Sequence, residues 1–239
     1  VIVPCYKGER YIASCLENLL GQNYQMKLEI IVVIDGNVDE SASIANRYPV
    51  KVIVLEKNQG LSAARNIGLE ASTGDYVHFM DVDDRINGAL FDTNADIACS
   101  GMFNDSKPYK CQIFRKMKVY SRERDKMSIT WVVKWGYVWR YIFKRQFLID
   151  NNLKFEVGRL IEDRYFSFSA LYLAHTVVTV PGAIYTYRNT EGSIMNIKDR
   201  KWRRRIHTDK KHSDVLIKEF AKQHHISAPG LGWNFGLVC

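Results

Sequence analysis

The amino-acid sequence predicts an α/β fold in which a mostly parallel sheet is flanked by helices. Over the first hundred residues, apolar runs of strand length alternate with segments whose apolar residues recur at helical spacing. The run at residues 28–34 is nearly continuous and β-branched, which is typical of a strand covered by helices on both faces. The chain has 239 residues, of which 46% are hydrophobic, so it can bury the core of one large domain.

The elements of the first half follow in a regular order. We expect strands at residues 1–4, 28–34, 50–55 and 76–80, and helices at residues 9–22, 39–48 and 61–71. Parallel strands joined by right-handed crossovers carry their carboxyl ends at one edge of the sheet, where α/β folds bind ligands. The loops at these ends are polar, acidic or glycine-containing, so this edge is the expected place for a nucleotide.

The regular alternation stops after Cys99. We expect an extended segment at 109–120, an amphipathic helix at 163–173, two strands at 176–180 and 183–188 around a turn at Pro181-Gly182, and a charged helix at 202–224. No linker separates the halves. We therefore treat residues 1–239 as one domain, with a ligand-binding half at 1–101, a second half at 102–198 and a basic helical tail at 199–239.

The charge of the chain is unevenly distributed. The formal net charge is +8, and residues 198–211 read KDRKWRRRIHTDKK, with Trp202 and Ile206 between the cations. A solvated helix face is one interpretation, and attraction to an anionic surface is the other. Because no nucleic-acid-binding module accompanies this run, we expect peripheral contact with an anionic membrane and no nucleic-acid partner.

Cysteine usage and hydropathy bear on the location of the chain. No apolar run reaches the length of a membrane span, and no signal peptide is visible. The cysteines are odd in number and form no CxxC pair, which favours reduced thiols; they are Cys5, Cys15, Cys99, Cys111 and Cys239. We expect a cytoplasmic protein that works at the cytoplasmic face of the membrane.

An acidic run follows the apolar segment at 76–80. On a strand, residues two apart point to the same side, so Asp81 and Asp83 are expected to aim at one spot. Carboxylates that crowd together repel one another, and a hard divalent cation such as magnesium, calcium or manganese removes this penalty. A solvated acidic turn is the alternative, and this run alone favours neither.

Taken together, these segments resemble the family 2 glycosyltransferases, whose Rossmann-like fold is called GT-A. The resemblance covers residues 1–193, and its segments occur in family order: VIVPCY at 1–6, EIIVVIDG at 29–36, NQGLSAARN at 58–66, DVDD at 81–84 and ED at 162–163. Each is weak alone, whereas all of them in order are specific. The resemblance implies transfer of a sugar, with inversion, from a nucleotide sugar (usually a UDP-sugar) to an acceptor hydroxyl, in the synthesis of cell-surface polysaccharide or another glycan.

The resemblance implies a donor site at the strand ends. Pro4, Tyr6 and Asp35 are expected to line the uracil pocket, with Asp35 accepting a hydrogen bond from the base. Arg65 is expected near the nucleotide, and Asp81 at the ribose or the metal. Without the resemblance, Tyr6 reads as a packing residue, Asp35 as a turn residue and Arg65 as a surface or packed arginine.

The resemblance also implies a metal ion and a diphosphate clamp. Asp83, together with Asp81, is expected to hold Mn²⁺ or Mg²⁺ against the diphosphate, with Asp84 as a further ligand or a supporting residue. Arg188, within YTYR at 185–188, and Ser193 match a later family segment that closes over the diphosphate.

The acceptor side of the resemblance is the pair Glu162-Asp163. In an inverting transfer a carboxylate must take the proton of the attacking hydroxyl, and Asp163 is the candidate for this general base. Glu162 is expected to face the acceptor, which is a glycan or a lipid-linked saccharide. Without the resemblance, the pair reads as the capping sequence that precedes a helix.

The sequence departs from the family pattern at three places. Lys7 stands where the family usually has Asn, Ile34 stands where an Asp is common, and residues 85–96 are too short for the usual helix and connection. Non-catalytic binding of a nucleotide sugar by a scaffold protein is the alternative function. Phosphotransferases of the haloacid dehalogenase type and sugar-nucleotide pyrophosphorylases fit less well, because their motifs are not met.

Overall fold

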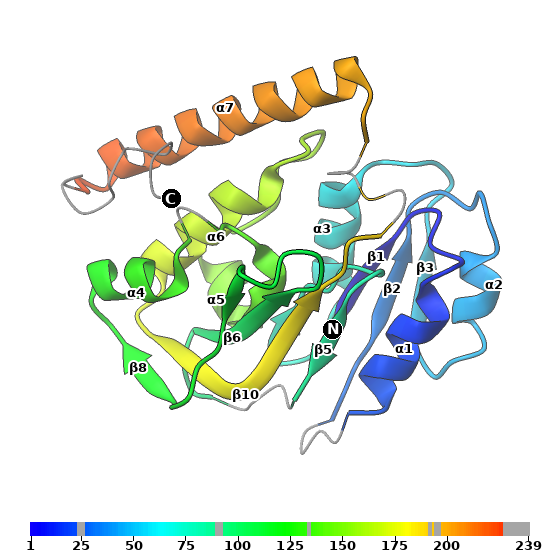
Figure 1. Cartoon of the computed structure of the whole chain (residues 1–239), viewed down its shortest axis with the longest axis horizontal. Helices are drawn as coiled ribbons and strands as arrows, with labels where there is room; N and C mark the ends of the chain where they lie inside the picture. Colours follow the sequence, from blue (N-terminus) through cyan, green and yellow to red (C-terminus); the bar gives the residue numbers. More distant parts are fainter. Residues whose placement is uncertain (23–26, 89–92, 133–134, 191–192, 194–196, 227–239) are drawn as a thin grey trace.

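The computed structural model describes residues 1–22, 27–88, 93–132, 135–190, 193 and 197–226 (Figure 1). The helices are α1 (Ile12–Leu20), α2 (Ser41–Ala45), α3 (Leu61–Ala71), α4 (Glu123–Thr130), η1 (Val138–Arg140), α5 (Arg145–Asp150), α6 (Glu162–Leu173) and α7 (Arg200–Gln223). The strands are β1 (Ile2–Cys5), β2 (Ile31–Ile34), β3 (Lys51–Val54), β4 (Tyr76–His78), β5 (Arg85–Asn87), β6 (Ile97–Asn104), β7 (Cys111–Gln112), β8 (Lys118–Tyr120), β9 (Tyr141–Lys144) and β10 (Val177–Tyr187).

The first half alternates strand and helix as expected. Strands β1, β2 and β3 form a parallel sheet in which β2 pairs with both neighbours. All four residues of β2 are buried, in agreement with its β-branched run. In β3 the terminal residues Lys51 and Val54 are exposed, because this strand lies at the edge of the sheet.

A second, mixed sheet continues the first one. Its order is β4-β9-β6-β10-β5, with β7 on β6 and β8 on β10. A parallel bridge from Ile2 to Phe79 and a 2.9 Å hydrogen bond from Met80 N to Ile2 O join β1 to the chain that leaves β4. The predicted α/β fold is confirmed. The parallel pairing of the first half gives way to mostly antiparallel pairing in the second.

The predicted turn at Pro181-Gly182 is wrong. The two expected strands form one strand, β10, which runs parallel to β6 along its whole length. The register shifts between Val180 and Ile184, so Pro181 and Gly182 lie in an irregularity of the strand, where the missing N–H of proline is tolerated. Beyond the shift, β10 pairs with β5, which belongs to the segment 85–96; residues 89–92 of that segment lie outside the described part.

The core sits between the sheets and the helices. Aromatic rings fill its centre: Phe155 and Phe166 stack with 4.0 Å between centroids, and Phe79 meets Phe155 edge-on at 5.0 Å. Helix α3 approaches β1 closely, because Gly68 presents no side chain there. A Cβ on Gly68 would lie 2.4 Å from Ile2 Cγ2, closer than packed carbons approach.

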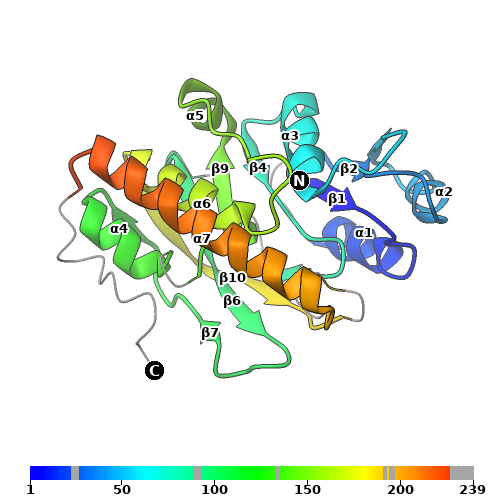
Figure 2. The ribbon, with the colours of Figure 1, turned by 90° about the horizontal axis from the view of Figure 1, so that it is seen from above.

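Helix α7 crosses the outer side of α6, as Figures 1 and 2 both show. The helix predicted at 202–224 is thus confirmed with shifted ends. Its inward face is anchored by Ile217 and Phe220, which are buried in the main core cluster. Within the described residues, no helix combines the length and the apolar composition needed to cross a membrane. Residues 227–239 of the predicted tail, with Cys239, lie outside the described part.

Candidate active site

The carboxyl ends of β1, β2 and β3 meet at one edge of the sheet. The Asp35 side chain is 3% exposed and accepts hydrogen bonds from the backbone N–H groups of Gln59 (2.6 Å) and Gly60 (2.8 Å). Gly60 has a φ of 92°, a conformation that favours glycine, and α3 begins directly after it. Asp35 therefore fixes the loop that leads into α3.

The first loop presents a ring and a cation to solvent. Pro4 lies within β1 and is buried, whereas Tyr6 just beyond the strand is 45% exposed. The Lys7 ammonium lies 5.4 Å from the centroid of the Tyr6 ring, and Lys7 itself has a φ of 52°. Of the expected pocket residues, Tyr6 is the one with an accessible surface, whereas Pro4 and Asp35 are buried.

The aspartates do not lie on a strand. Strand β4 ends at His78, and residues 81–84 form a turn in which Asp84 N donates to Asp81 O at 3.2 Å. Asp81 and Asp83 are expected to point to one spot because they alternate along a strand. That reason is wrong, because the strand ends before them. Each carboxylate has its own partner: Asp83 accepts a short hydrogen bond from the Thr190 hydroxyl.

Asp84 is the most buried of the three. The residue is 1% exposed. Its carboxylate accepts hydrogen bonds from the Tyr185 hydroxyl (2.8 Å) and from Arg188 N (2.7 Å). Burial, and then the charges of Asp81 and Asp83, raise the pKa of Asp84 well above its usual range. Burial and Asp81 likewise raise the pKa of Asp83.

Arg65 joins the aspartate turn to helix α6. Its guanidinium donates to Asp81 Oδ1 at 2.7 Å and to Glu162 Oε1 at 2.5 Å, and the arginine is 2% exposed. The Phe155 ring lies 5.3 Å from the guanidinium carbon. Arg65 and Glu162 are 97 residues apart in the sequence, so this pair links the two halves of the chain.

Glu162 and Asp163 form the first turn of α6. The residue at the N-cap position is Ile161, and no side chain caps the helix, so the capping interpretation of the pair is wrong. Burial, followed by the Glu162 charge, raises the pKa of Asp163 to about 7, against the opposing effect of Arg65. Burial also raises the pKa of Glu162. A carboxyl group that titrates near neutral pH is suited to accepting a proton.

The predicted diphosphate segment reaches the aspartate turn. Arg188 binds Asp84 through its backbone, and its guanidinium charge lowers the pKa of Asp83, against the larger effects of burial and Asp81. Ser193 N donates to Thr190 O at 3.4 Å, next to the hydroxyl that binds Asp83. Arg188 therefore lies beside the aspartate turn, and Ser193 contacts it through Thr190.

Several residues of the site were not anticipated. Tyr185 donates to Asp84, and its oxygen also accepts a hydrogen bond from Asp81 N at 3.1 Å. Trp139 stacks on Tyr185 at 4.3 Å and on Tyr137 at 4.9 Å. Burial and the nearby charge of Asp163 raise the pKa of Tyr137 to about 12. The aromatic stack thus spans the space between the aspartate turn and the predicted base.

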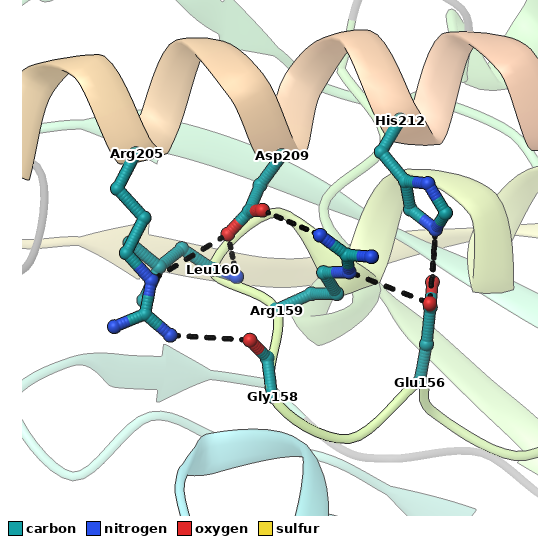
Figure 3. A network of polar contacts seen from close by, with 7 residues as sticks. All are labelled: Glu156, Gly158, Arg159, Leu160, Arg205, Asp209 and His212. Atoms are coloured by element: carbon teal, nitrogen blue, oxygen red, sulfur yellow. Dashed lines mark hydrogen bonds and ion pairs between the residues drawn. The ribbon is translucent and has the colours of Figure 1, made fainter.

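Helix α7 holds the loop that leads into α6 (Figure 3). Asp209 is 5% exposed, and its carboxylate accepts hydrogen bonds from Arg159 and from Leu160 N, both at 3.1 Å. Arg205, one turn earlier, donates to Gly158 O at 3.1 Å. Because Leu160 lies two residues before Glu162, α7 fixes the approach to the predicted base.

Further contacts extend the attachment of α7 on both sides of the loop. His212 Nε2 lies 2.9 Å from each carboxylate oxygen of Glu156. Arg164, directly after the predicted base, forms a 2.8 Å ion pair with Asp214 of α7.

The described residues do not form a complete metal site by themselves. Within the described residues, no group of three or more histidine, cysteine, aspartate or glutamate side chains is arranged to hold a metal ion. The oxygens of Asp81 and Asp83 fit a hard cation, and the raised pKa of Asp83 reflects a charge repulsion that a cation would relieve. Such a cation takes oxygen ligands, which include phosphate oxygens and water.

Solved structures define the class of the fold. TarS 1-349 from S. aureus, in complex with UDP-GlcNAc, superposes with a TM-score of 0.71 at 22% identity, covering 95% of this chain and 72% of the TarS 1-349 chain. The mannosyltransferase PcManGT from Pyrobaculum calidifontis, in complex with GDP-Man and Mn²⁺, has a TM-score of 0.57 at 16% identity, covering 96% and 76% of the two chains. The chain therefore has the GT-A fold of glycosyltransferases.

Sequence comparison identifies the family. Residues 1–99 match the family described as Glycosyl transferase family 2. The uncharacterized glycosyltransferase EpsJ of Bacillus subtilis is 32% identical over 217 residues, which cover 82% of this chain and 62% of EpsJ. Glycosyltransferase GlyA of Streptococcus pneumoniae is 30% identical over 229 residues, covering 84% of this chain and 32% of GlyA. The chain belongs to the family 2 glycosyltransferases. It spans less than two thirds of the length of these two relatives.

Proposed function

We propose that the chain transfers a sugar from a UDP-sugar to an acceptor hydroxyl with inversion at the anomeric carbon. The observation that carries this proposal is the joint placement of two carboxylate groups by Arg65. Its guanidinium binds Asp81 of the aspartate turn and Glu162 next to the predicted base. A donor at the turn and an acceptor at α6 would then face each other across one buried ion-pair cluster.

The donor nucleotide would occupy the ends of β1, β2 and β3. Tyr6 offers an exposed ring on which a base can stack, and Asp35 and Pro4 would line the same pocket; Asp35 also fixes the loop that leads into α3. Asp35 already accepts two backbone hydrogen bonds, so any bond to the base would use a remaining lone pair. Because TarS is a structural neighbour in complex with UDP-GlcNAc, uridine is the nucleoside we propose.

Asp83 and Asp81 would hold Mn²⁺ or Mg²⁺ together with the donor diphosphate. A bound cation would supply charge neutralisation as the diphosphate leaves. Arg188 and Ser193, which lie beside Asp83 and Thr190, would bind the same diphosphate through cationic and hydroxyl groups. Asp84 would keep the turn in place through Tyr185 and would not face the donor.

Asp163 would act as the general base. As the acceptor oxygen attacks the anomeric carbon, the Asp163 carboxylate takes the hydroxyl proton, and UDP departs from the opposite face with the electron pair of the broken bond. The pKa of about 7 keeps a substantial fraction of this carboxyl ionised near neutral pH. Glu162, paired with Arg65, would orient the acceptor side of the cluster.

The test is a donor-hydrolysis and transfer assay with a matched substitution. UDP release is measured over a panel of UDP-sugars and saccharide acceptors in the presence of Mn²⁺, for the parent chain, Asp163→Asn and Asp75→Asn. Asp75 is exposed and lies apart from the site, so its substitution controls for loss of one carboxylate. We expect UDP binding by all three proteins and loss of turnover in Asp163→Asn alone. Turnover in Asp163→Asn equal to the parent would contradict the proposed base.

The acceptor and location follow from the same proposal. We propose a glycan or lipid-linked acceptor at the cytoplasmic face of an anionic membrane, within cell-surface polysaccharide synthesis. The basic run at 198–211 supports this, because its arginines and lysines are exposed on α7 while Asp209 points inward. Trp202 and Ile206 are half-buried, so this face offers charge and little apolar surface.

A further inference from the structure

Exposed apolar side chains gather on a short segment of the second half. We call residues 105–120 the apolar-basic arm; it contains β7 and β8. Its exposed apolar side chains are Tyr109 (79% exposed), Ile113 (58%), Met117 (51%) and Val119 (67%). Soluble surfaces carry such side chains singly, whereas a cluster of them indicates a surface that contacts an apolar partner.

The arm is also strongly basic. Five of its residues are lysine or arginine and one is acidic, and the cations alternate with the apolar residues along the sequence. Around Met117, the side chains of Arg115, Lys116 and Lys118 are exposed. The single acid, Asp105, accepts a 3.0 Å hydrogen bond from Asn189 N. A protein partner with an apolar patch explains the apolar residues but not these cations, whereas an anionic lipid surface explains both.

The arm is supported by the sheet from one side. β7 pairs with β6 and β8 pairs with the first residues of β10, so the backbone is held in both places. Phe114, 9% exposed, anchors the stretch between them in the core. The backbone of the arm is therefore fixed at β7 and at β8, while the apolar side chains named above stay exposed. In Figure 2, β7 lies at the periphery of the molecule, away from α5.

One end of the arm adjoins the candidate active site. Asp105 N donates to Tyr187 O at 3.1 Å, and Asp105 accepts from Asn189 N. Arg188, between these two residues, binds Asp84 of the aspartate turn. The Asp105 end of the arm is therefore next to the predicted diphosphate site, whereas β8 pairs with the opposite end of β10.

We propose that the apolar-basic arm docks on the surface of an anionic lipid bilayer, with its apolar side chains in the headgroup boundary and its cations on lipid phosphates. This site differs from the basic run of α7. The arm supplies both exposed apolar side chains and cations for interfacial binding. Helix α7 supplies mainly charge, since Trp202 and Ile206 are half-buried. Docking needs no turnover, so it stands or fails separately from the proposed reaction.

The experiment measures binding of the purified chain to sedimented vesicles. Vesicles of phosphatidylcholine alone are compared with vesicles that also contain phosphatidylglycerol, at low and at physiological salt. The test variant is Ile113→Ser with Val119→Ser, and the matched control is Ile149→Ser with Val54→Ser, an isoleucine and a valine exposed elsewhere. Thermal unfolding followed by circular dichroism checks that each variant is folded.

We expect the parent and the control to bind anionic vesicles alike and the test variant to bind about tenfold or more weakly at both salt concentrations. A second variant removes charge from the arm: Arg115→Gln, Lys116→Gln and Lys118→Gln together should weaken binding chiefly at low salt. Its counterpart on α7 is Lys201→Gln with Arg203→Gln and Arg204→Gln, which should weaken binding less at physiological salt.

Three outcomes would overturn the proposal. The parent chain fails to sediment with anionic vesicles at low salt. The test variant binds as the parent does while the α7 variant does not, which assigns docking to α7. The parent forms concentration-dependent oligomers that Ile113→Ser with Val119→Ser abolishes, which assigns the arm to contact between copies of the chain.

Discussion

Asp163 is the residue whose titration should determine how activity depends on pH. Burial and Glu162 raise its pKa to about 7, against Arg65 and Arg164, and Asp81 acts in the same direction as Glu162. A base works when it is deprotonated, so we expect kcat/KM to rise with pH through about 7 and to level off above it. Initial rates across the pH range in which the chain stays folded measure this. A rate that is independent of pH between 6 and 8 would contradict the assignment.

The same raised pKa predicts that the folded state loses stability as the pH rises, whereas activity increases. The folded state holds the Asp163 proton more tightly than the unfolded state, whose pKa is near the usual 3.8. Stability contributed by this group is therefore lost as pH rises from about 4 to about 7. We expect Asp163→Asn to raise the melting temperature at pH 8 and to leave it nearly unchanged at pH 4. Equal melting temperatures of the parent and Asp163→Asn at pH 8 would contradict the raised pKa of Asp163.

Arg65 is expected to be the most costly single charge to remove. Its truncation in Arg65→Ala leaves the buried Glu162 without its cation, and breaking a buried pair in this way costs about 3–5 kcal/mol. We expect Arg65→Met with Glu162→Gln to be less destabilised than Arg65→Ala, because the double variant removes the fully buried charge of Glu162. Asp81 loses its cation in both variants, and its side chain is 26% exposed. Urea unfolding monitored by circular dichroism gives both free energies, and equal losses would refute the coupling.

At the scale of elements, α7 acts on the site through the loop before α6. Asp209→Asn weakens the contacts to Arg159 and Leu160 N, so the first turn of α6 should be less well positioned. We expect kcat to fall about tenfold with little change in the donor KM, and stability to fall by about 1–3 kcal/mol. The control is Asp199→Asn at the N-cap of the same helix, where asparagine can still accept from Trp202 N.

Close approach of α3 and β1 predicts a specific packing cost. In Gly68→Ala the new Cβ would lie 2.4 Å from Ile2 Cγ2, and the overpacked pair should cost about 1–3 kcal/mol. Gly74→Ala is the matched control, since its Cβ would meet its nearest neighbour at 3.5 Å. Chemical denaturation of the two variants compares them, and a smaller loss in Gly68→Ala than in the control would contradict the packing argument.

Local pattern predicted the elements of the first half well and those of the second half less well. The alternation of apolar runs gives the strands around Val33 and the helix at 61–71, because these depend on neighbours in sequence. The sequence signal Pro181-Gly182 suggested a turn, yet pairing along β6 keeps β10 continuous. Tertiary pairing overrides a local turn signal there, and no local pattern contains that information.

At the scale of the whole molecule, the candidate site is made from pairs that are distant in sequence. Arg65 meets Glu162, and Asp84 meets Tyr185, 101 residues later. The motif residues could be identified from the sequence, since they follow strand ends. Their partners Tyr185, Thr190 and Trp139 could not, although the spacing of Tyr185 and Tyr187 places two aromatic side chains on one face of a strand.

The proposed metal ion would be bound by the assembled site, and this proposal predicts a linked equilibrium. We expect Mn²⁺ or Mg²⁺ to strengthen UDP binding, because Asp83 and the diphosphate would both be ligands of the cation. Isothermal titration of UDP with and without the cation measures the coupling, and Asp83→Asn should reduce it about tenfold or more. Asp150→Asn, an exposed carboxylate on α5, is the control. UDP affinity that neither cation alters would remove the metal from the proposed function.

The stacking of Trp139 on Tyr185 gives the chain a built-in optical probe. The two rings are 4.3 Å apart with 16° between their planes, and the Tyr185 hydroxyl touches both Asp84 and Asp81 N. A ligand that repositions the aspartates would disturb this indole, so binding at the candidate active site becomes visible as altered emission or near-ultraviolet ellipticity without any label. Subtracting the spectra of Trp139→Phe isolates that signal from the remaining tryptophans.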